Sequence, residues 1–199
     1  AGRAKIRRPN DSILPWSKTT LPWMSFGYET QIPPIYTLAF YNAIANNGKM
    51  VRPLFTKEIM QNGKTVKSFS TEVVRESICS EQTLAMIKEM LLGVVEKGTG
   101  SAVHSDVVRI AGKTGTAQNP IGRDHSTFLS FAPKDNPKIA ISVYVEHGGF
   151  GATAALPIAS LLEEMYLTDT ITRPQLVQQV KNLPYALPRR YQDNAKTRK

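Results

Sequence analysis

Hydrophobic residues recur at helical spacing in three stretches of the chain, residues 35–44, 84–95 and 152–166. Two prolines precede the first stretch and Asn46-Asn47-Gly48 follows it, which is typical of a helix start and a helix stop. The second stretch forms one apolar stripe that ends at Gly98. The pattern therefore predicts three helices.

Alternating residues predict the strands. Asn62-Gly63 lies between two alternating segments and predicts a β-hairpin, because Asn-Gly favours a two-residue hairpin turn. Three strand-like segments follow the second helix, at residues 107–117, 126–132 and 138–145. The last is apolar on both alternating sets, which predicts a strand covered on both faces. This order of elements predicts an α+β fold in which helices back an antiparallel sheet.

The two ends of the chain differ in composition from the middle. Residues 1–30 are rich in Pro, Trp and Ser and show neither period, so we expect an irregular segment that leads into the domain. Residues 31–167 carry the predicted elements. Residues 168–199 are polar and basic, and we expect a loose tail beyond Thr170.

Composition narrows the possible partners and cofactors. The net charge of +9 is concentrated at the two ends, where solvated termini explain it, so we expect no nucleic-acid partner. The single cysteine, Cys79, excludes an internal disulfide and a multi-cysteine metal site. His125 is expected to have a structural rather than a catalytic role, and no partner can be named for it. His104 and His147 lack metal-site spacing and are expected at the surface. No run approaches the roughly 18 apolar residues of a membrane span.

Residues 111–118 read Ala-Gly-Lys-Thr-Gly-Thr-Ala-Gln and predict a strand that presents polar groups to a cleft. Because side chains alternate along a strand, Thr114 and Thr116 share a face and can offer paired hydroxyls to a carboxylate. Lys113 adds a positive charge suited to an anion or to proton transfer, and Gly115 permits close approach of a ligand backbone. At an open sheet edge, such a strand can also pair with a peptide.

Two other interpretations of this run compete. Gly112-Lys113-Thr114 matches the end of a phosphate-binding P-loop, but that motif needs a glycine five residues earlier, where Val107 stands. It also needs a helix to follow, where Pro120 and Gly122 occur instead. A turn between strands is the commonest setting of a bare Lys-Thr-Gly triplet, so the neighbouring sequence has to decide.

The neighbouring sequence resembles the penicillin-binding protein and serine β-lactamase superfamily, whose third active-site motif is Lys-Thr-Gly. Residues 27–48 are similar to the family's helix after the second motif, residues 91–102 to the helix and loop before the third, and residues 124–140 to its last two strands. The resemblance covers residues 20–167. It identifies the chain with class B penicillin-binding proteins, as the C-terminal part of a transpeptidase domain with the β-lactamase/transpeptidase-like fold.

That resemblance implies roles for five residues. Lys113 would tune the proton-relay residues across the cleft, and the amide of the second catalytic residue, Thr116, would form half of an oxyanion hole. The hydroxyls of Thr114 and Thr116 would bind the carboxylate of a D-Ala-D-Ala stem peptide or a β-lactam. Gly115 and Gln118 would line the bound substrate. The resemblance implies neither a metal nor an organic cofactor.

Two family motifs are absent from this sequence. No lysine has a serine three residues before it, and no asparagine has a serine two residues before it, so Ser-x-x-Lys and Ser-x-Asn are missing. We therefore expect a piece of a longer protein that lacks the N-terminal half of its domain and the nucleophile. The longer protein is expected on the outer side of the bacterial cytoplasmic membrane, anchored by an N-terminal helix outside this chain, with divisome or elongasome proteins as possible partners.

Three alternatives stay open from the sequence. The chain is also compatible with a related D,D-carboxypeptidase or β-lactamase, or with a non-catalytic module that binds peptidoglycan or a partner protein. Residues up to about 118 resemble the division-type class B proteins, whereas residues 119–172 resemble the elongation-type ones. Septal and side-wall synthesis therefore both remain.

Overall fold

The computed structural model describes residues 2–13 and 15–184. Contacts along the chain form two compact units, Ala1–Lys88 and Glu89–Lys199. Helix α3 (Glu81–Lys97) crosses the boundary between them. Each unit is described by itself.

The first unit contains one longer helix and several short elements. α2 (Pro34–Ala45) confirms the first predicted helix, and its last turn is buried. The segment predicted to be irregular holds three short elements, namely β1 (Lys5–Ile6), α1 (Thr20–Met24) and β2 (Thr30–Gln31), with β1 antiparallel to β2.

The predicted hairpin of the first unit is confirmed. β4 (Glu58–Gln61) pairs with β5 (Lys64–Ser68), and the two turn residues have positive φ angles of 50° at Asn62 and 73° at Gly63. Positive φ at both central positions is the type I′ geometry that favours Asn-Gly. β3 (Met50–Val51) precedes this hairpin in the chain, β6 (Val73–Arg75) follows it, and the two strands pair with each other.

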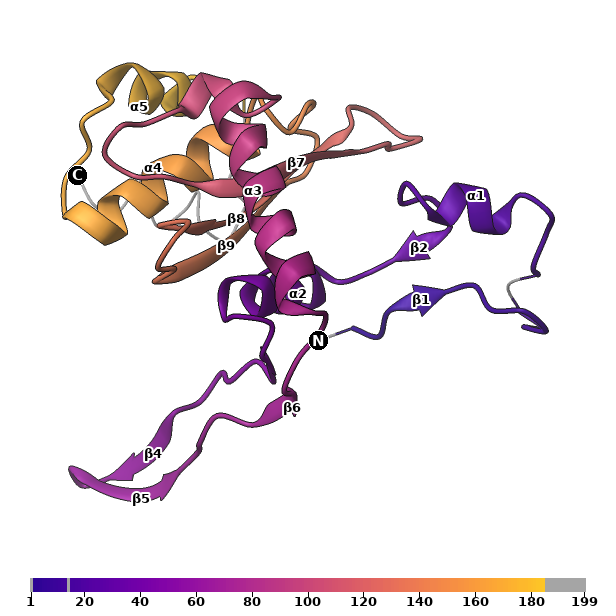
Figure 1. The fold of residues 1–199 in the computed structure, drawn as a ribbon, viewed down its shortest axis with the longest axis horizontal. Helices are drawn as coiled ribbons and strands as arrows, with labels where there is room; N and C mark the ends of the chain where they lie inside the picture. The colour runs from indigo at the N-terminus through magenta and orange to yellow at the C-terminus, as the bar shows by residue number, and fades with distance from the viewer. Residues whose placement is uncertain (1, 14, 185–199) are drawn as a thin grey trace, which may run out of the picture. The chain divides into compact units, whose positions relative to one another are not determined.

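The second unit is built on a three-stranded antiparallel sheet in the order β7-β8-β9 (Figure 1). Its strands are β7 (Ala111–Ala117), β8 (His125–Ala132) and β9 (Ile139–Val145). β7 begins four residues later than the sequence predicts. The Ser105 hydroxyl accepts hydrogen bonds from the amides of Val107 and Val108 and so holds this stretch in a turn after the short helix η1 (Ser101–Val103).

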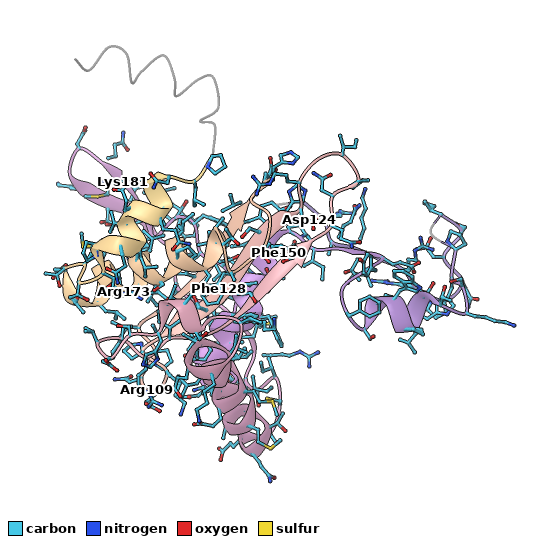
Figure 2. All side chains as sticks on the ribbon, turned by 90° about the horizontal axis from the view of Figure 1, so that it is seen from above. Arg109, Asp124, Phe128, Phe150, Arg173 and Lys181 are labelled. Carbon is cyan, nitrogen blue, oxygen red and sulfur yellow. The ribbon has the colours of Figure 1, made fainter. Side chains whose placement is uncertain are left out.

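Helix α4 (Ala155–Thr168) packs against β8 and β9 and encloses the core. Phe128, labelled in Figure 2, is fully buried there with Leu156 and Ala159. β9 contributes alternate residues to this core, but all seven of its residues stay at least partly exposed. The prediction that β9 is covered on both faces is therefore wrong for the described residues, because α4 covers one face only.

The prediction of a loose chain beyond Thr170 is also wrong for the described residues. α5 (Pro174–Lys181) packs on α4, and Leu176 lies in the core with 6% of its surface exposed. Three apolar residues on one face are enough to dock this short helix, although the segment as a whole is polar. Residues 185–199 lie outside the described residues, so the tail there stays a prediction.

A buried ion pair locks α5 in place. The Arg173 guanidinium bonds Glu164 through Nε at 2.9 Å and donates from Nη1 to the Val103 carbonyl at 2.8 Å. Burial tends to raise the pKa of Glu164, but hydrogen bonds from Thr172 and Arg173 outweigh it and hold that pKa below its ordinary value. The carboxylate therefore stays ionised and paired at neutral pH.

No helix of the described residues could cross a bilayer.

Leu176→Ala is expected to lower the free energy of unfolding by about 2–5 kcal/mol, because it leaves a cavity under α5. Urea denaturation followed by circular dichroism measures this. Gln175→Ala, at an exposed position on the same helix, should change stability by less than about 0.5 kcal/mol. Equal stability of the two variants would show that α5 does not dock.

Candidate functional site

The predicted Lys-Thr-Gly strand lies at an edge of the sheet. β7 pairs with β8 along all seven residues, and no strand pairs with its other side among the described residues. Lys113 and Thr116 are exposed, whereas Thr114 and Gly115 are half-buried. The structure therefore brings these four predicted residues together on one accessible strand with a free edge.

The register assigns their side chains to two faces of the sheet. Thr114 pairs with Phe128 and Thr116 with the buried Ser126, so both threonines lie on the face toward α4. This confirms that the two hydroxyls share a face. Lys113 alternates with them and lies on the opposite face, so the cation and the hydroxyls can reach a ligand at the free edge from two sides.

Hydrogen bonds orient the polar groups of this strand. The Thr114 and Thr99 hydroxyls are 3.0 Å apart, and the Gly151 amide donates to Thr116 Oγ1 at 3.2 Å. Since the Thr116 oxygen acts as an acceptor in that bond, its own hydrogen is available to an anion. Lys113 Nζ donates to the Thr114 carbonyl at 2.8 Å, which keeps the ammonium group beside the strand.

Close packing requires glycine at two positions around the strand. A Cβ added at Gly115 would lie 2.4 Å from Thr127 Oγ1, so a neighbouring hydroxyl fills the space beside this residue. A Cβ at Gly151 would lie 2.5 Å from the Gly115 carbonyl oxygen and 2.8 Å from that of Thr127. The loop before α4 thus lies directly on the Lys-Thr-Gly backbone, and Gly115 has a packing role whether or not a ligand approaches it.

Gln118 is exposed and follows the last residue of β7. Its predicted role in lining the substrate stays a prediction. Among the described residues, no group of three or more His, Cys, Asp and Glu side chains is arranged to hold a metal ion.

The end of the sheet where β8 begins and β9 ends contains an arrangement that the sequence did not predict. No partner was predicted for His125, and His147 was expected at the surface, yet their rings are 5.3 Å apart and the His147 amide donates to His125 Nδ1. The Gly149 amide bonds the Asp124 carbonyl at 2.8 Å, and Figure 2 shows Asp124 and Phe150 at the same end of the sheet. Because β8 and β9 are antiparallel, the start of β8 lies beside the end of β9. This pairing of the predicted strands could have indicated that the two histidines lie close together.

A buried acid on the α4 side of the sheet was also missed. Glu163 is fully buried, and burial raises its pKa to about 8 against the opposing effects of Ser130 and Arg173. Helical spacing places it on the inner face of α4. A glutamate at a core position was the available signal.

Gly151→Ala is expected to lower the free energy of unfolding by about 1–3 kcal/mol, because its Cβ would collide with two backbone oxygens that have little room to move. Gly93→Ala is the matched control, since nothing lies within 4 Å of a Cβ there. That helical substitution should be neutral or stabilise by up to about 1 kcal/mol. Thermal denaturation compares the two variants, and a Gly151→Ala protein as stable as Gly93→Ala would contradict the close packing.

The sequence of the whole chain is similar to those of known proteins. The model of the penicillin binding protein transpeptidase domain matches residues 9–195. Stage V sporulation protein D of Bacillus subtilis is 31% identical over 163 residues, which cover 76% of this chain and 25% of that protein. Peptidoglycan D,D-transpeptidase MrdA of Haemophilus influenzae is 29% identical over 181 residues, which cover 79% of this chain and 27% of that protein. The chain thus spans about a quarter of the length of these two relatives.

Solved structures show the same fold. Penicillin-binding protein A from Mycobacterium tuberculosis, in an imipenem acyl-enzyme complex, matches with a TM-score of 0.67 and 27% identity over 76% of this chain and 35% of that chain. Pseudomonas aeruginosa PBP2 in complex with WCK 5153 matches with a TM-score of 0.58 and 30% identity, over 72% of this chain and 31% of that chain. These similarities confirm the predicted α+β fold of the β-lactamase/transpeptidase type. The chain therefore belongs to the penicillin-binding protein transpeptidase domain family.

Proposed function

We propose that the chain is the C-terminal part of the transpeptidase domain of a longer class B penicillin-binding protein. In this proposal the longer protein is a peptidoglycan D,D-transpeptidase that cross-links stem peptides on the outer side of the bacterial cytoplasmic membrane. The observation that carries the proposal is the free-edged strand β7 with Lys113 and Thr116 exposed on it. Relatives named as peptidoglycan D,D-transpeptidases support it.

The strand has the chemistry to bind a peptide that ends in a carboxylate. Lys113 supplies a full positive charge, and the Thr116 hydroxyl keeps a hydrogen to donate while Gly151 holds its oxygen. The D-Ala-D-Ala terminus of a stem peptide would lie along the free edge, where backbone groups of β7 can pair with it. Thr114 and Gln118 would complete the contacts on either side of Gly115.

Catalysis would depend on groups that stabilise developing charge. The Thr116 amide would form half of an oxyanion hole, and removal of one such donor in a hydrolase typically costs about 10²–10³ in rate. Lys113 would favour the proton transfers that accompany attack by a serine hydroxyl. That serine and its lysine would come from outside these 199 residues, because the sequence has no Ser-x-x-Lys.

β-Lactams would bind the same groups, since they too present a carboxylate beside a reactive carbonyl. Neighbouring structures of penicillin-binding protein A contain imipenem and penicillin G as acyl-enzyme complexes. Divisome or elongasome proteins are the expected partners of the longer protein.

A non-catalytic peptidoglycan-binding module is the second candidate. The strand could bind a carboxylate without acyl transfer, because carboxylate binding does not require the nucleophile. A D,D-carboxypeptidase is a third possibility, distinguished by release of D-Ala to water without cross-link formation.

Fluorescent penicillin labelling separates an acyl-transferring enzyme from the non-catalytic module. The longer protein should form a stable covalent adduct, whereas the 199-residue chain should form none because it lacks the serine. Lys113→Ala in the longer protein should slow labelling by about 10² or more, since the proton transfers lose their nearby cation.

Lys138→Ala is the matched control, because Lys138 is exposed in the same unit but lies outside β7. It should label at the wild-type rate. A covalent adduct on the 199-residue chain, or normal labelling of Lys113→Ala, would refute the assigned roles. A longer protein that binds stem peptide without labelling would favour the binding module.

A further inference from the structure

Three fully buried polar side chains lie on the α4 side of the sheet. Glu163 and Ser160 come from α4, and Ser130 comes from β8. Both Glu163 carboxyl oxygens and both serine hydroxyl oxygens lack a partner with hydrogen-bond geometry. Buried polar groups are usually paired, so this cluster needs an explanation beyond packing.

The Glu163 carboxyl is held as a neutral acid. Burial raises its pKa to about 8, opposed by Ser130 and by Arg173. Arg173 is already bonded to Glu164, and it acts on Glu163 through its charge and not through a hydrogen bond. Among the described elements, β8, β9, α5 and η1 pack most extensively on α4, and their other ionisable side chains are His125, Tyr144 and Lys181. None of these three acts on the pKa of Glu163.

Ser130 connects this acid to the Lys-Thr-Gly strand. It pairs directly with Gly112, the residue before Lys113. A Cβ at Gly112 would lie 2.7 Å from the Ser130 Cβ and 2.6 Å from the Leu129 carbonyl oxygen. With so little space between the two strands, a displacement of Ser130 is passed on to the backbone that carries Lys113.

We infer that Glu163 is a positioning residue for the active-site strand, which it supports through Ser130 and Gly112 while its carboxyl carries a proton. In its protonated form the acid places no charge against Ser130 and the sheet. Loss of the proton introduces a buried charge, and Arg173 cannot pair with it because Arg173 is bonded to Glu164. Ser130 and Gly112 must then shift to accommodate the charge. This inference rests on the proposed function.

The kinetic test measures the rate of penicillin acylation of the longer protein between pH 6 and 9.5. A group with a pKa of about 8 is roughly 90% ionised at pH 9, so the wild-type rate should fall about tenfold relative to Glu163→Gln between pH 7 and 9. The Gln side chain has the same size and cannot ionise. Glu146→Gln, which removes an exposed charge on the same unit, should keep the wild-type profile.

A second variant protects the test against misfolding of Glu163→Gln. Ser130 lowers the pKa of Glu163, so Ser130→Ala should raise that pKa. The alkaline limb of the pH–rate profile, where the acylation rate falls, should then move to higher pH. A purely structural role of Ser130 would change the rate without moving the limb. An alkaline limb that is identical in wild type, Glu163→Gln and Ser130→Ala overturns the inference.

An NMR titration tests the inference without acylation. In the ¹⁵N-glycine-labelled longer protein, the Gly112 amide signal should titrate near pH 8 in wild type and stay constant in Glu163→Gln. A Gly112 signal that does not titrate in wild type overturns the inference whatever the labelling result. A titrating Gly112 in a protein that penicillin never labels would uphold the positioning role and refute the proposed function.

Discussion

The outer edge of β7, which no other strand of the described residues pairs with, is the constraint on which the rest of the site depends. A strand at a sheet edge has free amide and carbonyl groups, and proteins usually cover or blunt such edges. Here the edge strand carries glycine, two threonines and one lysine, so it is polar, narrow and positively charged. These features allow a peptide with a terminal carboxylate to add alongside the strand, and they give the pairing a defined end.

Such an edge is useful only if the inner side of the strand is rigid. β8 supplies the rigidity, because Phe128 fills the core against α4 and the Ser126 hydroxyl accepts from the Ala155 amide at 2.9 Å. The same hydroxyl donates to the Phe150 carbonyl at 3.0 Å and so fixes the loop that lies on Gly115. The core therefore sets the position of the strand, while its outer edge stays available.

Periodicity and turn chemistry were sufficient for most elements of the fold. Helical stripes predicted α2, α3 and α4, and Asn62-Gly63 predicted the hairpin, because local spacing alone determines those patterns. α5 was missed because its apolar stripe has only three residues and lies in a polar segment, so its packing on α4 is what distinguishes it from a loop. The strand residues were found through resemblance, and alternation alone places Lys113 opposite Thr116, but only the register shows which of the two faces lies toward α4. Glu163 was missed because the cost of burying it depends on residues distant in sequence.

The measurement that tests the central claim most directly is a titration of the ¹⁵N-labelled longer protein with a stem peptide ending in D-Ala-D-Ala. We expect the Thr116 amide signal to shift on binding. The same peptide with its terminal carboxylate converted to an amide should bind at least about tenfold more weakly, because a charge-assisted contact is lost. Equal affinity for the two peptides, or a Thr116 signal that does not respond to either, would contradict the account.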